Sequence, residues 1–239
     1  MPDNAVIRRV SALDLKVESG AWSWAESRRA DIDAHFAMRQ REKPGIWNGQ
    51  VLLARNADFS DGKLSSSYFR TDFASFLAWR DWGFPDRDVF NGFGMGALRS
   101  ADGAFVLGEM GGATVNAGRI YFPAGTPDPD DIVGDRLDIA GSITREIEEE
   151  TGLTPADYQA GQHWDCIAVG ASVAIIRILT VDMPGEALKG RIEANLARQT
   201  NPELSAIHLA RATSDLNASM PRFVTAFLEH AFANSGALS

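Results

Sequence analysis

Apolar and polar residues follow two different periods along this chain, one typical of strands and one typical of helices. Short apolar or alternating runs predict strands near residues 13–18, 51–55 and 64–70. Between and after them, helical spacing predicts helices over residues 24–41 and 73–82. The first 88 residues are therefore expected to form an N-terminal α+β extension or small domain.

From about residue 89 onward, the pattern is richer in strands. An Asp-Gly turn at 102–103 lies between two alternating runs, which predicts a hairpin over residues 97–107. Further strands are expected at 119–122, 164–169, 172–181 and 204–209, and helices at 186–198 and 221–232. Strands interrupted by helices indicate helices packed on a mixed sheet, so we predict an α/β domain over residues 89–239.

The strongest indication of function is an acidic segment at residues 145–153, Arg-Glu-Ile-Glu-Glu-Glu-Thr-Gly-Leu. Glu146, Glu149 and Glu150 stand at i, i+3 and i+4, which places their carboxylates on one face of a helix. Like charges at these spacings repel, and a cation such as Mg²⁺, Mn²⁺ or Ca²⁺ would compensate them. The alternative is a solvated acidic helix end, with Gly152 simply adopting the left-handed conformation that ends a helix.

The same segment resembles the second half of the Nudix hydrolase signature, Arg-Glu-(apolar)-x-Glu-Glu-x-Gly-(apolar). Upstream, Pro123-Ala124-Gly125 resembles the turn that opens the family's loop. Between them, Asp131 and Leu137 stand where the signature has Gly and Glu, so the loop over 126–137 is lengthened. The early Glu has no clear counterpart, and we expect Asp138 to cap the helix instead.

The resemblance implies a Nudix-type α/β/α sandwich that binds Mg²⁺, with Mn²⁺ as a substitute, and hydrolyses a phosphoanhydride bond. The metal ligands would be Glu146, Glu149, Glu150 and the main-chain carbonyl of Ala124. Glu146 and Arg145 would be the catalytic pair, with Arg145 orienting the glutamates by ion pairing rather than touching substrate.

The general base is less well defined by the resemblance, because it varies among Nudix branches. Glu146 is the first candidate. Glu203, which directly precedes a predicted strand, is the second. For Glu203, a role as an ordinary exposed loop carboxylate stays open.

The expected substrate is a small nucleoside diphosphate linked to another moiety. Residues 46–52 and 69–77 resemble the N-terminal region of Nudix proteins that hydrolyse UDP-glucose, which implies a UDP-sugar cleaved to UMP and a sugar 1-phosphate. Candidates for a stacking aromatic are Phe69, Trp47 and Tyr121. Candidates for phosphate binding are Arg70 and Arg119. Core packing and surface ion pairing are the ordinary alternatives for these residues.

Two other functions stay open. The missing early Glu and the longer loop would suit a catalytically silent Nudix-like module that binds a ligand. A pyrophosphatase acting on coenzyme A is the other, although the additional upstream motif expected of it is not found. The Gly-rich run at 92–96 does not favour a dinucleotide loop, because an extended segment follows it where a helix is required.

Composition narrows the classes of partner. The formal charge is −9 and the pI about 4.9, which argues against a nucleic-acid-binding or anionic-membrane-binding surface. No secretory h-region or transmembrane-length apolar stretch occurs, and Cys166 lies alone in an apolar run as expected for a buried thiol. We therefore expect a cytoplasmic protein. The oligomeric state is not indicated, and the 126–137 loop is expected to be a solvated excursion rather than a lid or dimer contact.

Overall fold

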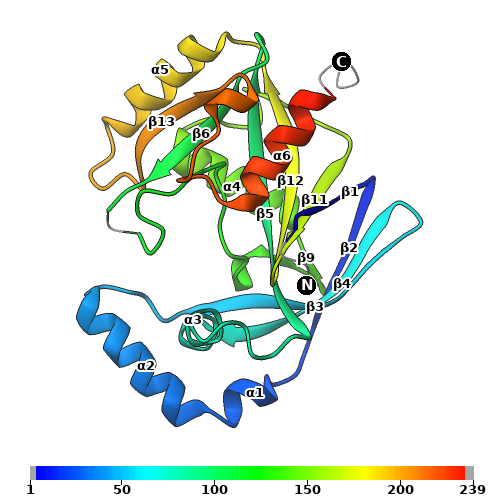
Figure 1. Cartoon of the computed structure of the whole chain (residues 1–239), viewed down its shortest axis with the longest axis vertical. Coiled ribbons are helices and arrows are strands. Elements are labelled where there is room, and N and C mark those ends of the chain that lie inside the picture. The colour runs from blue at the N-terminus through cyan, green and yellow to red at the C-terminus, as the bar shows by residue number, and fades with distance from the viewer. Residues whose placement is uncertain (1–3, 113, 235–239) are drawn as a thin grey trace.

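The chain is built on one mixed β-sheet, which runs through both halves of the molecule (Figure 1). The computed structural model describes residues 4–112 and 114–234. Among these residues, 13 strands belong to the sheet, and its main path runs β1-β11-β12-β5-β3-β4-β2-β9-β8. The strands are β1 (Val6–Val10), β2 (Ala12–Glu18), β3 (Gln50–Ser60), β4 (Lys63–Asp72), β5 (Val89–Ser100), β6 (Phe105–Met110), β7 (Ile120–Tyr121), β8 (Ile132–Val133), β9 (Arg136–Leu137), β10 (Gln159–Ala160), β11 (Trp164–Val169), β12 (Ser172–Val181) and β13 (Leu204–Ala210).

Helices lie on both sides of the central strand β5. They are α1 (Ser23–Glu26), α2 (Arg29–Glu42), α3 (Phe73–Asp81), α4 (Ile139–Thr151), α5 (Gly185–Leu196) and α6 (Arg222–Ala233), with the 3-10 turns η1 (Pro129–Asp131) and η2 (Thr213–Asp215). Gly94 and Gly96 of β5 face α4, whereas Phe93 contacts Phe223 of α6 with ring centroids 5.5 Å apart. Because neighbouring strand residues point to opposite faces, this confirms the predicted α/β fold with helices on both sides of a mixed sheet. No helix in the described part of the chain combines the length and apolar character needed to cross a bilayer.

The N-terminal strands and helices share a hydrophobic cluster of their own. β3 pairs antiparallel with β4, and β2 pairs parallel with β4. Helix α3 follows β4 without a loop, because Asp72 ends the strand and caps the helix by accepting a hydrogen bond from the Ser75 N–H at 2.8 Å. The buried members of the cluster are Trp22, Ala25, Ile32, Phe36, Val51, Leu53, Phe69, Ala74, Phe76, Leu77, Ala78, Trp79 and Val89.

The buried members of this cluster lie within residues 22–89, but the sheet continues across the predicted division near residue 88. β1 pairs with β11, and β5 pairs with both β3 and β12. Leu15, Leu52 and Tyr68 from the N-terminal part also belong to the large core of the second part. The separation of residues 1–88 from 89–239 as two units therefore remains a prediction.

The large core contains an aromatic group beneath α6 and the single thiol of the chain. Phe105, Phe122 and Phe227 make edge contacts with centroid distances of 5.5–6.0 Å. Cys166 on β11 is 1% exposed, and burial raises its pKa to about 12. The expectation of a buried structural thiol is confirmed.

The glycines at 92, 94 and 96 allow other elements to approach one face of β5 closely. A Cβ at Gly94 would lie 2.8 Å from Cγ1 of Ile143, and one at Gly96 would lie 2.8 Å from Cδ1 of Ile147. A Cβ at Gly92 would collide with the Tyr68 hydroxyl. The run lies inside strand β5, so it is a packing feature, as expected from the extended segment that follows it.

The expectation that residues 126–137 form a solvated excursion is wrong. This segment folds into η1 and the β8–β9 hairpin, and Lys16 of β2 pairs with Arg136 of β9. The Pro127 carbonyl accepts a hydrogen bond from the Leu52 N–H at 2.7 Å. Asp131 and Leu137 are buried, so the lengthened loop packs between the N-terminal strands and α4.

We predict that Gly96→Ala lowers the free energy of unfolding by about 1–3 kcal/mol, because the added methyl must displace Ile147 and Ile143 in a packed core. The control is Gly190→Ala in the exposed middle of α5, where nothing lies within 4 Å of the added Cβ. That variant should gain about 0.5–1 kcal/mol through higher helix propensity. Urea unfolding measures both, and a Gly96→Ala protein as stable as the wild type would contradict the close packing of α4 on β5.

Candidate active site

Helix α4 carries the acidic segment, and its ends are fixed by the residues expected to fix them. Asp138 accepts a hydrogen bond from the Gly141 N–H at 2.9 Å, which confirms it as the N-cap. Gly152 ends the helix with a φ of 73°, a left-handed conformation that suits glycine. Ile139, Ile143 and Ile147 face β5, which turns the acidic residues toward the edge of the helix–sheet interface.

The three glutamates differ sharply in exposure. The side chain of Glu149 is 61% exposed, that of Glu146 is 13% exposed, and Glu150 as a whole residue is 3% exposed. Both carboxylate oxygens of Glu150 are buried, and neither has a hydrogen-bond partner among the described residues. A buried carboxyl without a partner is costly to ionise, so this position is poised to gain a positively charged ligand or a proton.

Burial and mutual repulsion raise the pKa values of this group. Burial raises the pKa of Glu146 to about 7, partly opposed by the positive charge of Arg145. Burial, with the charges of Glu146 and Glu203, raises the pKa of Glu150 to about 9. The structure therefore brings the carboxylates close enough to sense one another electrostatically.

The Pro123-Ala124-Gly125 turn meets α4 at these carboxylates. A Cβ at Gly125 would collide with Oε1 of Glu146, so only glycine leaves room for that carboxylate. The Ala124 main chain lies close enough to Glu150 to lower its pKa, although without hydrogen-bond geometry to either oxygen. The Pro123 carbonyl accepts a hydrogen bond from the Gly96 N–H at 3.2 Å, which ties the turn to β5.

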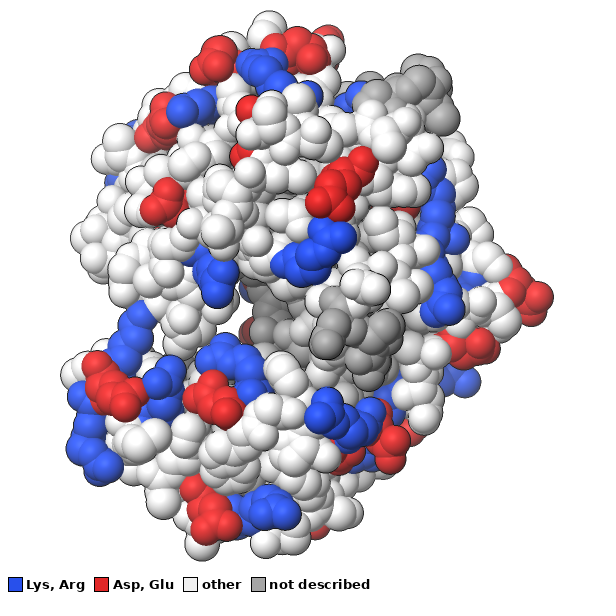
Figure 2. Space-filling model, in the orientation of Figure 1, with Lys and Arg blue, Asp and Glu red and all other residues white. Residues whose placement is uncertain are grey.

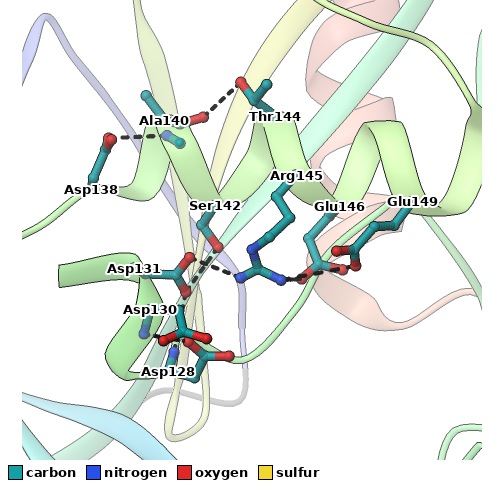
Figure 3. A network of polar contacts seen from close by, with 11 residues as sticks. Asp128, Asp130, Asp131, Asp138, Ala140, Ser142, Thr144, Arg145, Glu146 and Glu149 are labelled. Atoms are coloured by element: carbon teal, nitrogen blue, oxygen red, sulfur yellow. Dashed lines mark hydrogen bonds and ion pairs between the residues drawn. The ribbon is translucent and has the colours of Figure 1, made fainter.

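Arg145 connects Glu146 to a buried aspartate that the sequence did not identify as functional. Its Nη2 lies 2.8 Å from Oδ1 of Asp131, and its Nη1 lies 3.1 Å from Oε1 of Glu146 and 3.9 Å from Oε2 of Glu149 (Figure 3). Ser142 Oγ donates to Asp131 at 3.2 Å, and the Asp128 N–H donates at 3.1 Å. In the sequence, Asp131 is notable only because it stands where the signature has Gly. The Asp128-Pro129 start of a short helical turn was the available signal.

Glu203 lies within electrostatic range of the α4 glutamates, although it is more than fifty positions away in the sequence. Its carbonyl accepts a hydrogen bond from the Gly111 N–H at 2.7 Å, where β13 runs beside β6. The residue as a whole is exposed, yet partial burial and the charge of Glu149 raise the pKa of its carboxyl. Its charge in turn raises the pKa values of Glu146 and Glu150.

Within residues 4–112 and 114–234, no three His, Cys, Asp or Glu side chains are arranged as a ready-made metal site. The roles of Glu146, Glu149, Glu150 and Ala124 as metal ligands therefore remain predictions, as does the choice between Glu146 and Glu203 as the base. The structure places Glu146 against Gly125, pairs Arg145 with Asp131 and Glu146, and brings the glutamates within electrostatic range of one another.

A cavity of about 470 Å³ opens beside the turn. Helix α3, strand β5, the segment before β7 and the start of α6 contribute its walls. The lining residues are Phe73, Phe76, Arg80, Asn91, Phe93, Val115, Asn116, Arg119, Tyr121, Ala124, Gly125, Thr126, Ser172, Met220, Pro221, Arg222 and Phe223. Ala124 and Gly125 line this cavity and also lie next to the carboxylates, so the turn borders both.

Only some of the residues that the sequence suggests for substrate binding line the cavity. Tyr121 and Arg119 line it. Phe69 does not, because it is 4% exposed and packed between the Arg55 guanidinium and Trp22. Arg70 and Trp47 also lie outside this cavity. Arg70 borders a different depression, beside Glu18. Trp47 is 62% exposed and borders a third depression, next to Phe73.

Comparison with known proteins gives only distant structural likeness. No family model matches the chain, and no curated protein does. Among solved structures, a MutT protein from Methanosarcina mazei is 18% identical, with 62% of this chain and 96% of that chain covered and a TM-score of 0.38. The Nudix hydrolase RenU from M. smegmatis is 12% identical, with 62% and 86% covered and a TM-score of 0.39. A NUDIX hydrolase from Nitrosomonas europaea is 16% identical, with 50% and 71% covered and a TM-score of 0.32. Likeness at this level leaves the function to be argued from the residues of this chain.

We predict that Asp131→Ala lowers the free energy of unfolding by about 1–3 kcal/mol, because it leaves Arg145 and Ser142 without their buried acceptor. The half-exposed guanidinium keeps the cost below that of a fully buried pair. Asp130→Ala, on the exposed side of the same turn, should change stability by less than about 0.5 kcal/mol. Equal effects in chemical unfolding would show that Asp131 does not anchor Arg145.

We predict that Gly125→Ala displaces the Glu146 carboxylate and lowers any catalytic turnover at this site by about tenfold or more, since small misplacements at a reacting centre are costly. Gly112→Ala, where nothing lies within 4 Å of the added Cβ, should behave as the wild type. Initial rates and thermal unfolding should be measured together, and unchanged rates in Gly125→Ala would place Glu146 outside the reaction.

Proposed function

We propose that this protein is a metal-dependent pyrophosphohydrolase of the Nudix type, which cleaves the pyrophosphate bond of a nucleoside diphosphate linked to another moiety. The observation that carries the proposal is the buried, unpartnered carboxylate of Glu150 beside Glu146 and the Ala124 turn. The resemblance of residues 145–153 to the Nudix signature supports it.

The residues at the site fit a hard divalent cation. All the candidate ligand atoms are oxygens, which Mg²⁺ and Mn²⁺ prefer over softer donors. A cation would also compensate the unpartnered Glu150 and the repulsion that raises the pKa of Glu146. We propose that Glu146, Glu149, Glu150 and the Ala124 carbonyl hold it. When bound, such an ion neutralises phosphate oxygens and increases the acidity of a bound water.

The chain's own residues would position the reacting groups. Arg145, fixed by Asp131, holds the Glu146 carboxylate against the turn at Gly125. Arg145 is therefore proposed as a positioning residue. Glu146 would accept the proton of the attacking water, with Glu203 as the second candidate at the same site.

For the substrate, we propose a UDP-sugar cleaved to UMP and a sugar 1-phosphate. Support comes from the resemblance of residues 46–52 and 69–77 to the UDP-glucose-hydrolysing branch, and from the contribution of Phe73 and Phe76 to the cavity wall. Those two residues come from the N-terminal part, so this part would take a direct role in substrate selection.

The test is to incubate the protein with UDP-sugars, ADP-ribose, NADH, coenzyme A and nucleoside triphosphates, with Mg²⁺ or with a chelator, and to identify products by mass. Chelator-sensitive release of UMP and a sugar 1-phosphate is expected. Chelator-sensitive hydrolysis of another compound instead would support the proposed hydrolase activity and refute the UDP-sugar as its substrate. Binding without any turnover would indicate a catalytically silent module.

We predict that Glu149→Gln lowers turnover about 100-fold or more while the fold is retained, because an amide is a poorer ligand for a hard cation than a carboxylate. Glu148→Gln is the matched control, since Glu148 is the exposed neighbour on the same helix and lies outside the proposed ligand set. Steady-state rates at several Mg²⁺ concentrations distinguish the two variants. Wild-type rates in Glu149→Gln would remove Glu149 from the metal site.

A further inference from the structure

We infer that the cavity beside the Ala124–Gly125 turn binds the nucleobase of the ligand, with Asn91 hydrogen-bonding to the edge of the base. This inference deepens the proposed function and rests on it, since it names the part of the substrate that the cavity would take.

Four phenylalanines from separate parts of the chain line the cavity, among polar and charged residues. Phe73 and Phe76 of α3 form an edge contact with a centroid distance of 5.8 Å. Phe93 of β5 and Phe223 of α6 form another at 5.5 Å. In Figure 1, α3 lies in the lower part of the molecule and α6 in the upper part. Aromatic side chains in a cavity wall favour a planar ring over an extended flexible chain.

Asn91, at the start of β5, supplies the polar group. Its Oδ1 is buried and has no hydrogen-bond partner among the described residues, although the side chain borders the cavity. An unsatisfied buried acceptor costs about 1–3 kcal/mol, so the site should favour a ligand that presents an N–H or O–H donor. An Asn amide offers an acceptor and donors side by side, which matches the adjacent donor and acceptor on the edge of a nucleobase. Ser172, opposite Asn91 in the sheet register, adds a hydroxyl.

Arginines contribute positive charge to the wall of the cavity. Among the described residues, the Arg119 guanidinium has no carboxylate partner, and it donates one hydrogen bond, to the Ala218 carbonyl at 3.4 Å. Arg222 is already paired with Glu229 at 2.9 Å. Lys and Arg side chains surround the hollow between the two halves of the molecule in Figure 2. Arg119 is therefore the cation best placed to meet a phosphate whose base occupies the cavity.

The test measures binding of nucleoside monophosphates, which have no phosphoanhydride bond to cleave. UMP, CMP, AMP and GMP are titrated into the wild-type protein in Mg²⁺ by calorimetry, with ribose 5-phosphate as the ligand that lacks a base. We expect at least one nucleotide to bind about tenfold or more tightly than ribose 5-phosphate. Equal affinities for all five ligands would overturn the inference.

Two variants test whether the preference for a nucleotide over ribose 5-phosphate arises in the cavity. Asn91→Leu and Phe223→Leu should each weaken the preferred nucleotide by about five- to tenfold and leave ribose 5-phosphate unchanged. Phe59→Leu, on β3 beneath Arg8, serves as the control for loss of a ring away from the cavity. Thermal unfolding of each variant detects loss of the fold. An equal loss for the nucleotide and for ribose 5-phosphate in folded variants would refute base recognition by Asn91 and Phe223.

The outcome is separable from that of the proposed function. Base-dependent binding without hydrolysis of any compound would support the inference and reject the hydrolase. Chelator-sensitive hydrolysis with no preference among bases, and none over ribose 5-phosphate, would support the hydrolase and reject the inference.

Discussion

The close approach of α4 to the glycine face of β5 is the constraint on which the site depends. With no Cβ at Gly94 and Gly96, the isoleucines of α4 can settle against the strand. This depth carries Glu150 below the surface and brings Glu146 against the Gly125 turn, which is itself hydrogen-bonded to Gly96. The packing of α4 therefore determines the acidity of the site, because burial is the main cause of the raised pKa values of both glutamates.

Much of the fold was accessible from the sequence because local signals agreed with tertiary structure. The strands at 164–169 and 172–181, the Asp-Gly hairpin and the Asp138 and Gly152 helix ends were all predicted as they occur. β1 was missed because its polar residues Arg8 and Arg9 obscure the strand pattern. Its pairing with β11, including the Arg9–Asp165 ion pair at 2.8 Å, is a long-range interaction with no local signal.

The candidate site was only partly accessible for the same reason. Periodicity alone placed Glu146, Glu149 and Glu150 on one helix face, but their unequal exposure depends on what packs against the helix. Asp131 is a partner of Arg145 only because the lengthened loop folds back onto α4. The sequence gives no sign that Asn91, Phe93 and Phe223 line a cavity, because the cavity forms only when their separate segments pack together.

The walls of the cavity have a consequence for the order of folding. Phe73 and Phe223 are about 150 positions apart, so the pocket that they line cannot exist until these two distant segments have come together. A partly folded chain would lack the pocket, and a ligand held there would bind only the completed fold. Such a ligand would then stabilise the whole molecule by mass action, linking the N-terminal helices to the C-terminal one in a single cooperative transition.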